Sequence, residues 1–280
     1  IAKVDTRIDA MRAKYAADPE FQKHEALLDN GIDLARLTYP EVRTLRCQMQ
    51  YIFQDPYSSL NPRMTVANII GEGLLAHKYC KKANERMHEE ILQTMEDCGL
   101  APYFLHRYPH QFSGGQRQRI GIARSLAVHP KFVVCDEAVS ALDVSIQSQI
   151  INLLQDLKEQ QHLTYLFITH DLSVVKYISD RIGVMYLGNL VELADSQEIF
   201  DHPMHPYTEA LLESIPTTEE KRDLAVLEGD IPSPVNPPKG CKFHTRCKYC
   251  TEICTHVVPD WEEVTPNHFV ACHHKLHTNV

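Results

Sequence analysis

Two adjacent carboxylates, Asp136 and Glu137, directly follow the apolar run at 132–135. A short, uninterrupted apolar run predicts a buried strand of a parallel sheet. Ligands bind at the carboxyl ends of such strands, so the pair suits phosphate chemistry: Asp136 on the side of a Mg²⁺ ion, and Glu137 as the base that orients an attacking water. Taken alone, the pair fits an acidic turn after a strand equally well.

A small-residue group comes just before a predicted helix that carries three arginines. The group is Ser113, Gly114, Gly115 and Gln116, and the arginines are Arg117, Arg119 and Arg124. Two glycines let a backbone approach an anion closely, and a helix N-terminus offers free N–H groups. These features indicate phosphate binding, although a simple N-cap with a loop explains the group by itself.

Two further polar side chains follow predicted strands. His170 comes after the apolar run at 165–168, and Gln54 ends the run at 50–54. An imidazole at a strand end can contact a transferring phosphoryl group, while an amide can hold a water or a metal ion without adding charge. Each is weak evidence alone, but the four groups together indicate nucleotide hydrolysis.

The elements that must position these groups alternate as in an α/β fold with a parallel sheet. We expect helices at 120–128, 146–160 and 172–179, a hairpin at 182–193 around Gly188 and Asn189, and a helical insertion over 66–107. Before them, two short amphipathic helices are expected within 1–30, with a break at Asp18 and Pro19. One side of the first carries Ile8, Met11 and Tyr15, together with Val4.

These patterns predict four parts of the chain. A charged helical segment spans 1–30, and the ATPase core spans 31–195 with a helical subdomain at about 65–128. A helical C-terminal segment covers 196–230, and 231–280 hold a proline-rich linker followed by a cysteine-rich tail.

Composition limits the classes of protein. The chain has 280 residues, 44% hydrophobic and 23% charged, with a formal net charge of −9. This charge argues against nucleic acid as the main partner. We also expect a soluble chain, because neither an apolar stretch of the ~20 residues that cross a bilayer nor the pattern of a signal peptide is present.

The nine cysteines fall into two sets. Cys47, Cys80, Cys98 and Cys135 are scattered among predicted helices and strands and indicate reduced, buried thiols of a cytoplasmic protein. The other five are Cys241, Cys247, Cys250, Cys254 and Cys272. For this tail we expect metal or cluster ligation first, free thiols second and disulfides last, and His244, His273 and His274 leave zinc open.

The order of the motifs resembles that of ATP-binding-cassette (ABC) ATPases, over about 31–193. The matching pieces are Gln54, Phe-Ser-Gly-Gly-Gln at 112–116, Val-Cys-Asp-Glu at 134–137, Ser-Ala-Leu-Asp at 140–143 and Thr-His-Asp at 169–171. The resemblance implies a P-loop NTPase-type fold that uses ATP and Mg²⁺. By this resemblance, Gln54 is the Q-loop glutamine beside Mg²⁺, and residues Ser113–Gln116 are the signature. Asp136 is the Walker B aspartate and Glu137 the catalytic base. Asp143 is the D-loop aspartate and His170 the switch histidine.

Three loops resemble the ATPase subunits of oligopeptide and dipeptide importers more closely. They are Ile-Phe-Gln-Asp-Pro-Tyr-Ser-Ser-Leu-Asn-Pro at 52–62, Ser-Ala-Leu-Asp-Val-Ser-Ile-Gln at 140–147 and His-Pro-Tyr-Thr-Glu-Ala-Leu-Leu at 205–212. This resemblance implies a second ATPase subunit, identical or different, two transmembrane permease subunits and an extracytoplasmic substrate-binding protein, with the chain peripheral at the cytoplasmic face of the membrane. The cargo stays open between peptides, nickel and another small solute.

The sequence departs from the family pattern at the phosphate loop. That loop has the form G-x-x-x-x-G-K-[ST], yet the 280 residues contain no Gly-Lys pair. We expect a truncated chain rather than a degenerate one. The alternatives are a non-catalytic subunit that only completes a partner's ATP site and an ABC ATPase of repair or translation, which the His-Pro-Tyr motif disfavours.

The cysteine tail is similar to the tail of peptide-importer ATPases. The resemblance aligns Cys241, Cys247, Cys254 and Cys272 with a quartet that binds a [4Fe–4S] cluster in some members. Cys250 is then the spare thiol. Zinc or no metal are the alternatives.

Overall fold

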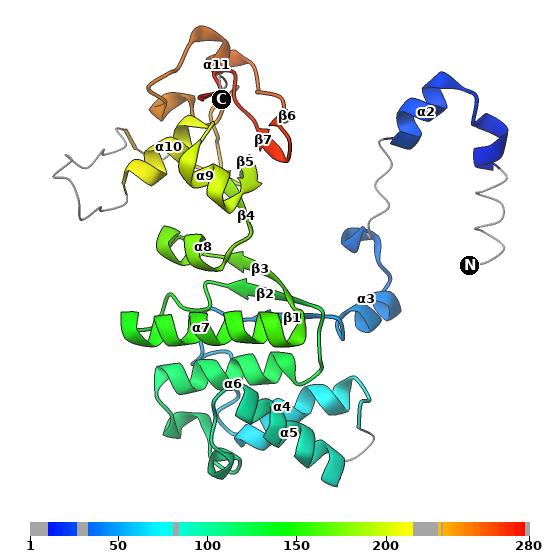
Figure 1. The fold of residues 1–280 in the computed structure, drawn as a ribbon, viewed down its shortest axis with the longest axis vertical. Helices are drawn as coiled ribbons and strands as arrows, with labels where there is room; N and C mark the ends of the chain where they lie inside the picture. The colour runs from blue at the N-terminus through cyan, green and yellow to red at the C-terminus, as the bar shows by residue number, and fades with distance from the viewer. Residues whose placement is uncertain (1–10, 27–32, 81–83, 215–228, 231, 278–280) are drawn as a thin grey trace. The chain divides into compact units, whose positions relative to one another are not determined.

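The computed structural model describes residues 11–26, 33–80, 84–214, 229–230 and 232–277 (Figure 1). The chain forms two compact units, Ile1–Arg46 and Cys47–Val280. The four domain boundaries expected from the sequence stay a prediction.

The first unit is helical in its described part. Residues 11–15 are helical, and α2 (Pro19–Ala26), the short 3₁₀ helix η1 (Leu34–Arg36) and α3 (Tyr39–Leu45) follow. The carboxylate of Asp18 accepts a hydrogen bond from the N–H of Glu20 at 2.9 Å, so the predicted break at Asp18 and Pro19 is the start of α2. Val4 and Ile8, expected on one helical face, lie outside the described residues.

A three-stranded parallel sheet is the centre of the second unit. It consists of β1 (Met49–Ile52), β2 (Phe132–Asp136) and β3 (Thr164–Ile168), in the order β1-β2-β3. The register pairs Ile52 with Cys135 and Asp136 with Ile168. All three strands therefore end at one edge of the sheet, where the predicted polar groups follow.

One face of this sheet is covered and the other is open. Val133 and Cys135 are fully buried, whereas Leu166 is 49% and Ile168 46% exposed. The prediction of a fully buried strand at 165–168 is therefore wrong for one of its faces. Figure 1 shows α6 (Gly114–Leu126) and α7 (Val144–Gln161) on the same side of the sheet.

The helical insertion is confirmed. α4 (Val66–Ala76) and α5 (Glu85–Asp97) pack against α6. The chain between α5 and α6 contains two short 3₁₀ helices, η2 (Pro102–Phe104) and η3 (Pro109–Gln111). α5 ends where Gly99 takes φ +67°, a backbone conformation that suits glycine after a helix. α6 begins at Gly114 rather than at the predicted residue 120, so the signature group lies within its first turn.

The C-terminal part forms a second, antiparallel sheet. The predicted hairpin is confirmed as β4 (Arg181–Tyr186) and β5 (Asn189–Asp195), with α8 (Leu172–Ile178) before it and α9 (Ser196–Asp201) and α10 (Pro206–Glu213) after it. The cysteine-rich tail adds η4 (His244–Arg246), α11 (Glu252–His256), β6 (Glu262–Thr265) and β7 (His268–Val270). The sheet order is β4-β5-β7-β6, so the tail continues the sheet of the hairpin.

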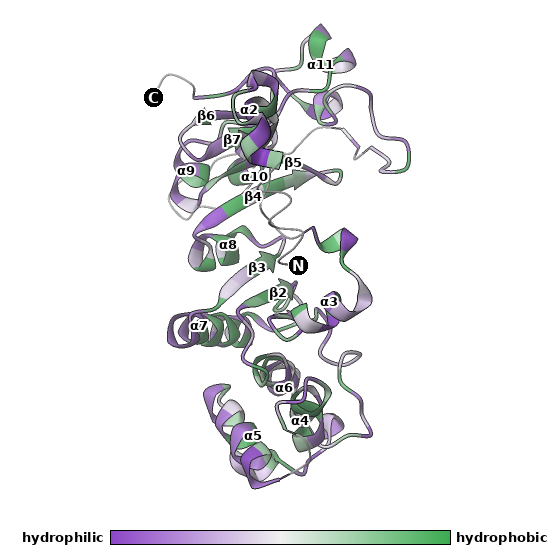
Figure 2. Ribbon diagram, turned by 90° about the vertical axis from the view of Figure 1, so that its right-hand side faces the viewer, coloured by the Kyte–Doolittle hydropathy of each residue, from purple (hydrophilic) through white to green (hydrophobic). Residues whose placement is uncertain are grey.

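The hydropathy of the helices fits this arrangement. Figure 2 shows both hydrophilic and hydrophobic residues along α5 and α7, as expected for helices with one packed face. Among the residues that the structure describes, none of the helices has the length and apolar character needed to cross a membrane.

Candidate active site

β2 delivers the two carboxylates to the edge of the sheet. Asp136 is its last residue, and the N–H of Glu137 donates to the carbonyl of Ile168 at 2.9 Å, which ties the strand end to β3. Glu137 takes φ +43°, in the left-handed region that non-glycine residues rarely adopt. Such strain persists where the surrounding structure imposes it, and it is concentrated at functional sites.

The predicted residues from three strand ends meet at Glu137. The amide Nε2 of Gln54 donates to Oε2 of Glu137 at 2.5 Å, and Nδ1 of His170 lies 3.1 Å from Oε1. Each carboxylate oxygen therefore has its own neighbour. The Glu137 side chain is 29% exposed and that of His170 73%, so the cluster opens to solvent on the side where a water can enter.

Asp136 has a partner that the sequence reasoning missed. The hydroxyl of Tyr51 donates to Oδ2 of Asp136, and this hydrogen bond raises the pKa of the Tyr51 phenol. The register pairs Tyr51 with Val134, and side chains two residues apart on a strand share a face. Alternation along β2, which puts Val134 and Asp136 on one face, was therefore the signal for this contact.

The signature group caps its own helix. Oγ of Ser113 accepts from the N–H of Gln116 at 3.4 Å, and Oε1 of Gln116 accepts from the N–H of Ser113 at 3.1 Å. This reciprocal capping box fixes the N-terminus of α6, with Ser113 exposed. The remaining free N–H groups of the first turn are available to an anion.

The two glycines of the signature differ in how much space surrounds them. A Cβ added to Gly115 would meet Cγ2 of Ile146 at 2.4 Å, whereas one added to Gly114 would meet Cδ2 of Leu142 at 3.5 Å. Gly115 is therefore required for the packing of α6 against α7, and only Gly114 is left for a close approach by a ligand. Because Leu142 and Ile146 flank Asp143, the signature lies beside the D-loop.

The three arginines of α6 bind the protein itself. Nε of Arg117 donates to the carbonyl of Phe112 at 3.1 Å, Nη1 of Arg119 to that of Cys98 at 2.9 Å, and Nη1 of Arg124 to that of Ser59 at 2.6 Å. Their contacts connect α6 to neighbouring loops.

Asp143 is not brought to the Glu137 cluster by a hydrogen bond in the described part of the chain. It is exposed at the N-terminus of α7 and its side chain makes no capping bond. Asp143 is therefore an exposed carboxylate next to the signature.

The nine cysteines are all free thiols. Cys80, Cys98 and Cys135 are buried as expected, whereas Cys47 is half-buried with its Sγ 2.9 Å from Nδ1 of His77. Burial raises the pKa of both Cys98 and Cys135 to about 12.

The tail thiols lie near one another. Burial, with a smaller contribution from neighbouring thiols, raises the pKa of Cys247 to about 11 and that of Cys272 to about 12. Within the described ranges, no group of three or more His, Cys, Asp or Glu side chains is arranged to hold a metal ion. The expected [4Fe–4S] or zinc site is therefore not supported by this geometry.

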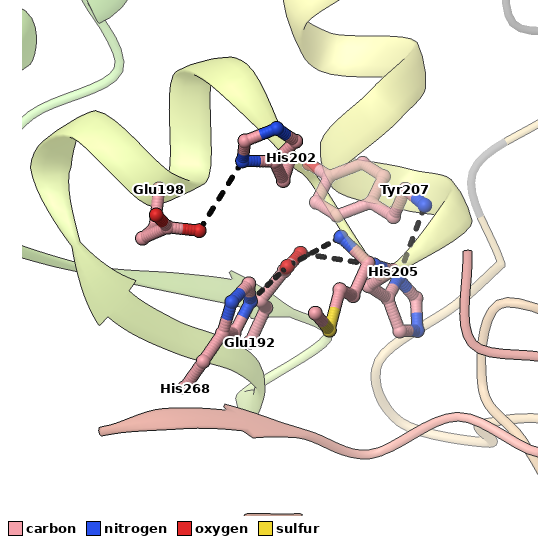
Figure 3. Close-up of polar contacts among 7 residues, drawn as sticks. Glu192, Glu198, His202, His205, Tyr207 and His268 are labelled. Carbon is pink, nitrogen blue, oxygen red and sulfur yellow. Dashed lines mark hydrogen bonds and ion pairs between the residues drawn. The ribbon is translucent and has the colours of Figure 1, made fainter. Parts of the chain in front are cut away.

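A buried carboxylate organises the C-terminal part instead (Figure 3). Oε1 of Glu192 accepts from the N–H of Met204 at 2.6 Å and from Nε2 of His268 at 2.8 Å, and Oε2 accepts from the N–H of His205 at 3.0 Å. Glu192, His205 and His268 are at most 1% exposed. Glu192 thus joins β5, β7 and the His-Pro-Tyr motif, none of which sequence spacing connects.

His205 is a structural residue in this cluster. Its Nδ1 accepts from the N–H of Tyr207 at 3.0 Å and caps α10. Burial lowers the pKa of His205 to about 4, against the opposing effect of Glu192. The imidazole is therefore neutral near pH 7.

Two family descriptions match the chain. Residues 16–140 match "ABC transporter", and residues 191–254 match "Oligopeptide/dipeptide transporter, C-terminal region". The oligopeptide transport ATP-binding protein AppF of Bacillus subtilis is 52% identical over 253 residues, covering 88% of this chain and 76% of AppF. The corresponding OppF of Haemophilus influenzae is 47% identical over 246 residues, covering 86% of this chain and 74% of OppF.

Solved structures agree on the fold. A dimeric ATP-binding cassette in a post-hydrolysis state, bound to ADP and Pi, superimposes with a TM-score of 0.53 at 27% identity, covering 60% of this chain and 72% of the other. The fold, the cluster at Glu137 and the two family matches agree, and the chain belongs to the family of oligopeptide transport ATP-binding proteins of ABC transporters.

Proposed function

We propose that this chain is the ATP-hydrolysing subunit of a peptide importer. The observation that carries the proposal is the convergence of Gln54 and His170 on the two carboxylate oxygens of Glu137. A carboxylate held on both sides at a strand end is arranged to orient a water molecule. The family supplies the reaction, which is hydrolysis of ATP to ADP and phosphate coupled to transport.

The residues divide the work as follows. Glu137 receives hydrogen bonds from Gln54 and His170 and directs a water in line with the γ-phosphate. His170, which is mostly exposed, is placed to contact the phosphoryl group as charge builds on it. Mg²⁺, when bound, neutralises charge on the phosphates, and Asp136 offers it a carboxylate. One such carboxylate suffices, because Mg²⁺ takes its other ligands from water and phosphate.

The signature is proposed to serve a nucleotide held by a second ATPase subunit. Its support is the exposed Ser113 at the N-terminus of a 13-residue helix, which presents backbone N–H groups to an anion. Asp143 stands exposed beside it. We therefore propose a dimer, with an identical or a different partner, in which each signature completes the opposite site.

The transport partners follow from the family. The match of residues 191–254 to the oligopeptide/dipeptide transporter C-terminal region supports peptides as cargo, ahead of nickel or another small solute. We propose two transmembrane permease subunits and an extracytoplasmic substrate-binding protein as partners. The chain would then lie at the cytoplasmic face of the membrane.

The experiment is ATP hydrolysis by the purified chain, alone and with a candidate partner subunit. Glu137→Gln is expected to lower kcat by a factor of roughly 10²–10⁴ with little change in KM for ATP, because only the orientation of the water is lost. Glu90→Gln is a matched control. Glu90 lies on α5, away from the strand ends, and its Oε2 is likewise 3.3 Å from a histidine nitrogen, Nε2 of His129. Equal rates for the two variants would overturn the assignment of Glu137.

A second candidate is a subunit that only completes its partner's site. The exposed Ser113 at the N-terminus of α6 favours it, because such a signature can serve a partner's nucleotide whether or not its own chain hydrolyses ATP. Mg-ATP titration of this chain separates the two. Tight binding supports the hydrolysing subunit. If hydrolysis appears only with a partner and survives Glu137→Gln, the non-catalytic role is correct.

For the tail we retain Cys241, Cys247, Cys254 and Cys272 as proposed cluster or zinc ligands, on the family resemblance and their proximity. Thiolate ligands must lose their protons on binding, and burial instead favours the protonated thiols of Cys247 and Cys272. Analysis of iron, acid-labile sulfide and zinc in anaerobically purified chain tests the proposal. A metal-free preparation with an intact fold would refute it.

A further inference from the structure

The segment that carries Gln54 is held by the signature helix. Residues 53–59 (the Q-loop segment) follow β1, and Arg124 of α6 contacts both ends of it. Nη1 of Arg124 donates to the carbonyl of Ser59 at 2.6 Å, and the guanidinium lies 5.3 Å from the ring centre of Phe53. The Arg124 side chain is half-buried, and this burial lowers the pKa of its guanidinium.

A second arginine of the same helix contacts the middle of the segment. The guanidinium carbon of Arg117 is 3.9 Å from the ring centre of Tyr57, and its Nε donates to the carbonyl of Phe112 at the base of the signature. Planar guanidinium groups stack on aromatic rings in a way that an ammonium group does not reproduce. Three separate contacts thus join α6 to residues 53–59.

The Q-loop segment is internally braced by two hydrogen bonds. The N–H of Tyr57 donates to Oδ1 of Asp55 at 2.8 Å, and the N–H of Ser59 donates to the carbonyl of Asp55 at 3.2 Å. Gln54, next to Asp55, donates to Glu137. A displacement of α6 is therefore carried through this turn to the carboxylate.

We infer that Arg124, assisted by Arg117, is a positioning residue that sets the place of the Gln54–Glu137 hydrogen bond according to the position of the signature helix. This inference rests on the proposed function, in which the signature faces a partner's nucleotide and Glu137 serves the nucleotide of its own chain. The two ATP sites of a dimer are then mechanically coupled within each subunit, since whatever moves α6 moves Gln54.

The test compares two conservative substitutions on one helix. Arg124→Lys keeps the charge but loses the guanidinium contact with the Phe53 ring and the bond to the Ser59 carbonyl. Arg119→Lys is the matched control, because Arg119 makes the same kind of bond at 2.9 Å, but to Cys98 at the end of α5. Amide hydrogen exchange of the Q-loop segment in the purified chain is the first readout and needs no nucleotide.

Arg124→Lys is expected to speed exchange of the Ser59 amide about tenfold, the size expected when a charge-assisted hydrogen bond is lost. Arg119→Lys should leave that amide unchanged and affect residues near Cys98 instead. Equal acceleration in both variants, or none in Arg124→Lys, would overturn the inference. A variant that unfolds would be detected by exchange throughout the chain, and Arg117→Lys then repeats the measurement at Tyr57.

The second readout is hydrolysis. Arg124→Lys should lower kcat several-fold with KM for ATP unchanged, and adding it to Gln54→Ala should cause no further loss, since both act through one hydrogen bond. Additive losses would refute the coupling. Absence of hydrolysis in the unmodified chain would count against the proposed function alone, because the exchange data still decide whether Arg124 holds the segment.

Discussion

An alanine at position 115 would place its methyl group 2.4 Å from Cγ2 of Ile146, well inside van der Waals contact. Gly115 is buried, and α6 packs there against α7, so either helix must shift by about 1 Å to admit it. Overpacking of this kind costs about 1–3 kcal/mol. The higher helix propensity of alanine returns up to about 1 kcal/mol. We therefore expect Gly115→Ala to destabilise the protein by about 0–2 kcal/mol.

The same helix contains the control. A Cβ added to Gly121 meets nothing within 4 Å, so Gly121→Ala gains the propensity term without a clash. We expect it to stabilise the protein by about 1 kcal/mol. The two substitutions are chemically identical and lie in one helix, but they should shift stability in opposite directions.

Urea unfolding followed by circular dichroism measures both variants. Ile146→Ala supplies a further check, because removing Cγ2 should make Gly115→Ala less costly than it is in the unmodified chain. If Gly115→Ala and Gly121→Ala stabilise equally, or if the cost at 115 is the same with and without Ile146, the packing explanation for Gly115 is incorrect. It would then be wrong that Gly115 is required for close packing of α6 against α7 and not for binding phosphate.

Three more outcomes are expected. Glu192→Ala should lower the free energy of unfolding by about 3–5 kcal/mol in urea titrations, because it leaves two buried N–H groups and an imidazole without their acceptor; a loss below 1 kcal/mol would contradict the role of Glu192. Burial holds the pKa of His205 at about 4, against about 6.5 in the unfolded chain, so the unfolded state gains a proton first as the pH falls. The free energy of unfolding should therefore be at its full value above about pH 6.5 and fall by up to about 3 kcal/mol as the pH drops to 4. Urea midpoints measured across that range would show the loss. Iodoacetamide should label the exposed Cys250 in the native protein, but Cys98 and Cys135 only after unfolding; mass spectrometry of the labelled peptides would reveal any early reaction of the buried pair.

The sequence was sufficient for the catalytic strand ends. Apolar runs that end in polar residues predicted β2 and β3, and parallel pairing of these strands is what brings Glu137 and His170 within 3.1 Å. The hairpin was equally predictable, because Gly188 and Asn189 mark a tight turn between two alternating runs.

Contacts that join distant segments were not predictable. Glu192 and His268 are 76 positions apart, and a glutamate in a strand gives no sign that it will be fully buried. β7 pairs with β5, and β6 pairs with β7. Val, Thr and Phe in these segments favour strands, but runs of four and three residues are too short to predict which strand they pair with. The bond from Arg124 to the carbonyl of Ser59, 65 positions away, was equally hidden in the sequence.

The backbone conformation of Glu137 is unfavourable for a residue other than glycine. With φ +43°, the position would hold a glycine at lower cost, and a left-handed non-glycine residue is strained by about 1–3 kcal/mol. Selection for stability alone would replace this glutamate. A library of variants screened only for yield or heat resistance should therefore favour glycine at this position. On the role proposed for Glu137, those variants should also hydrolyse ATP more slowly.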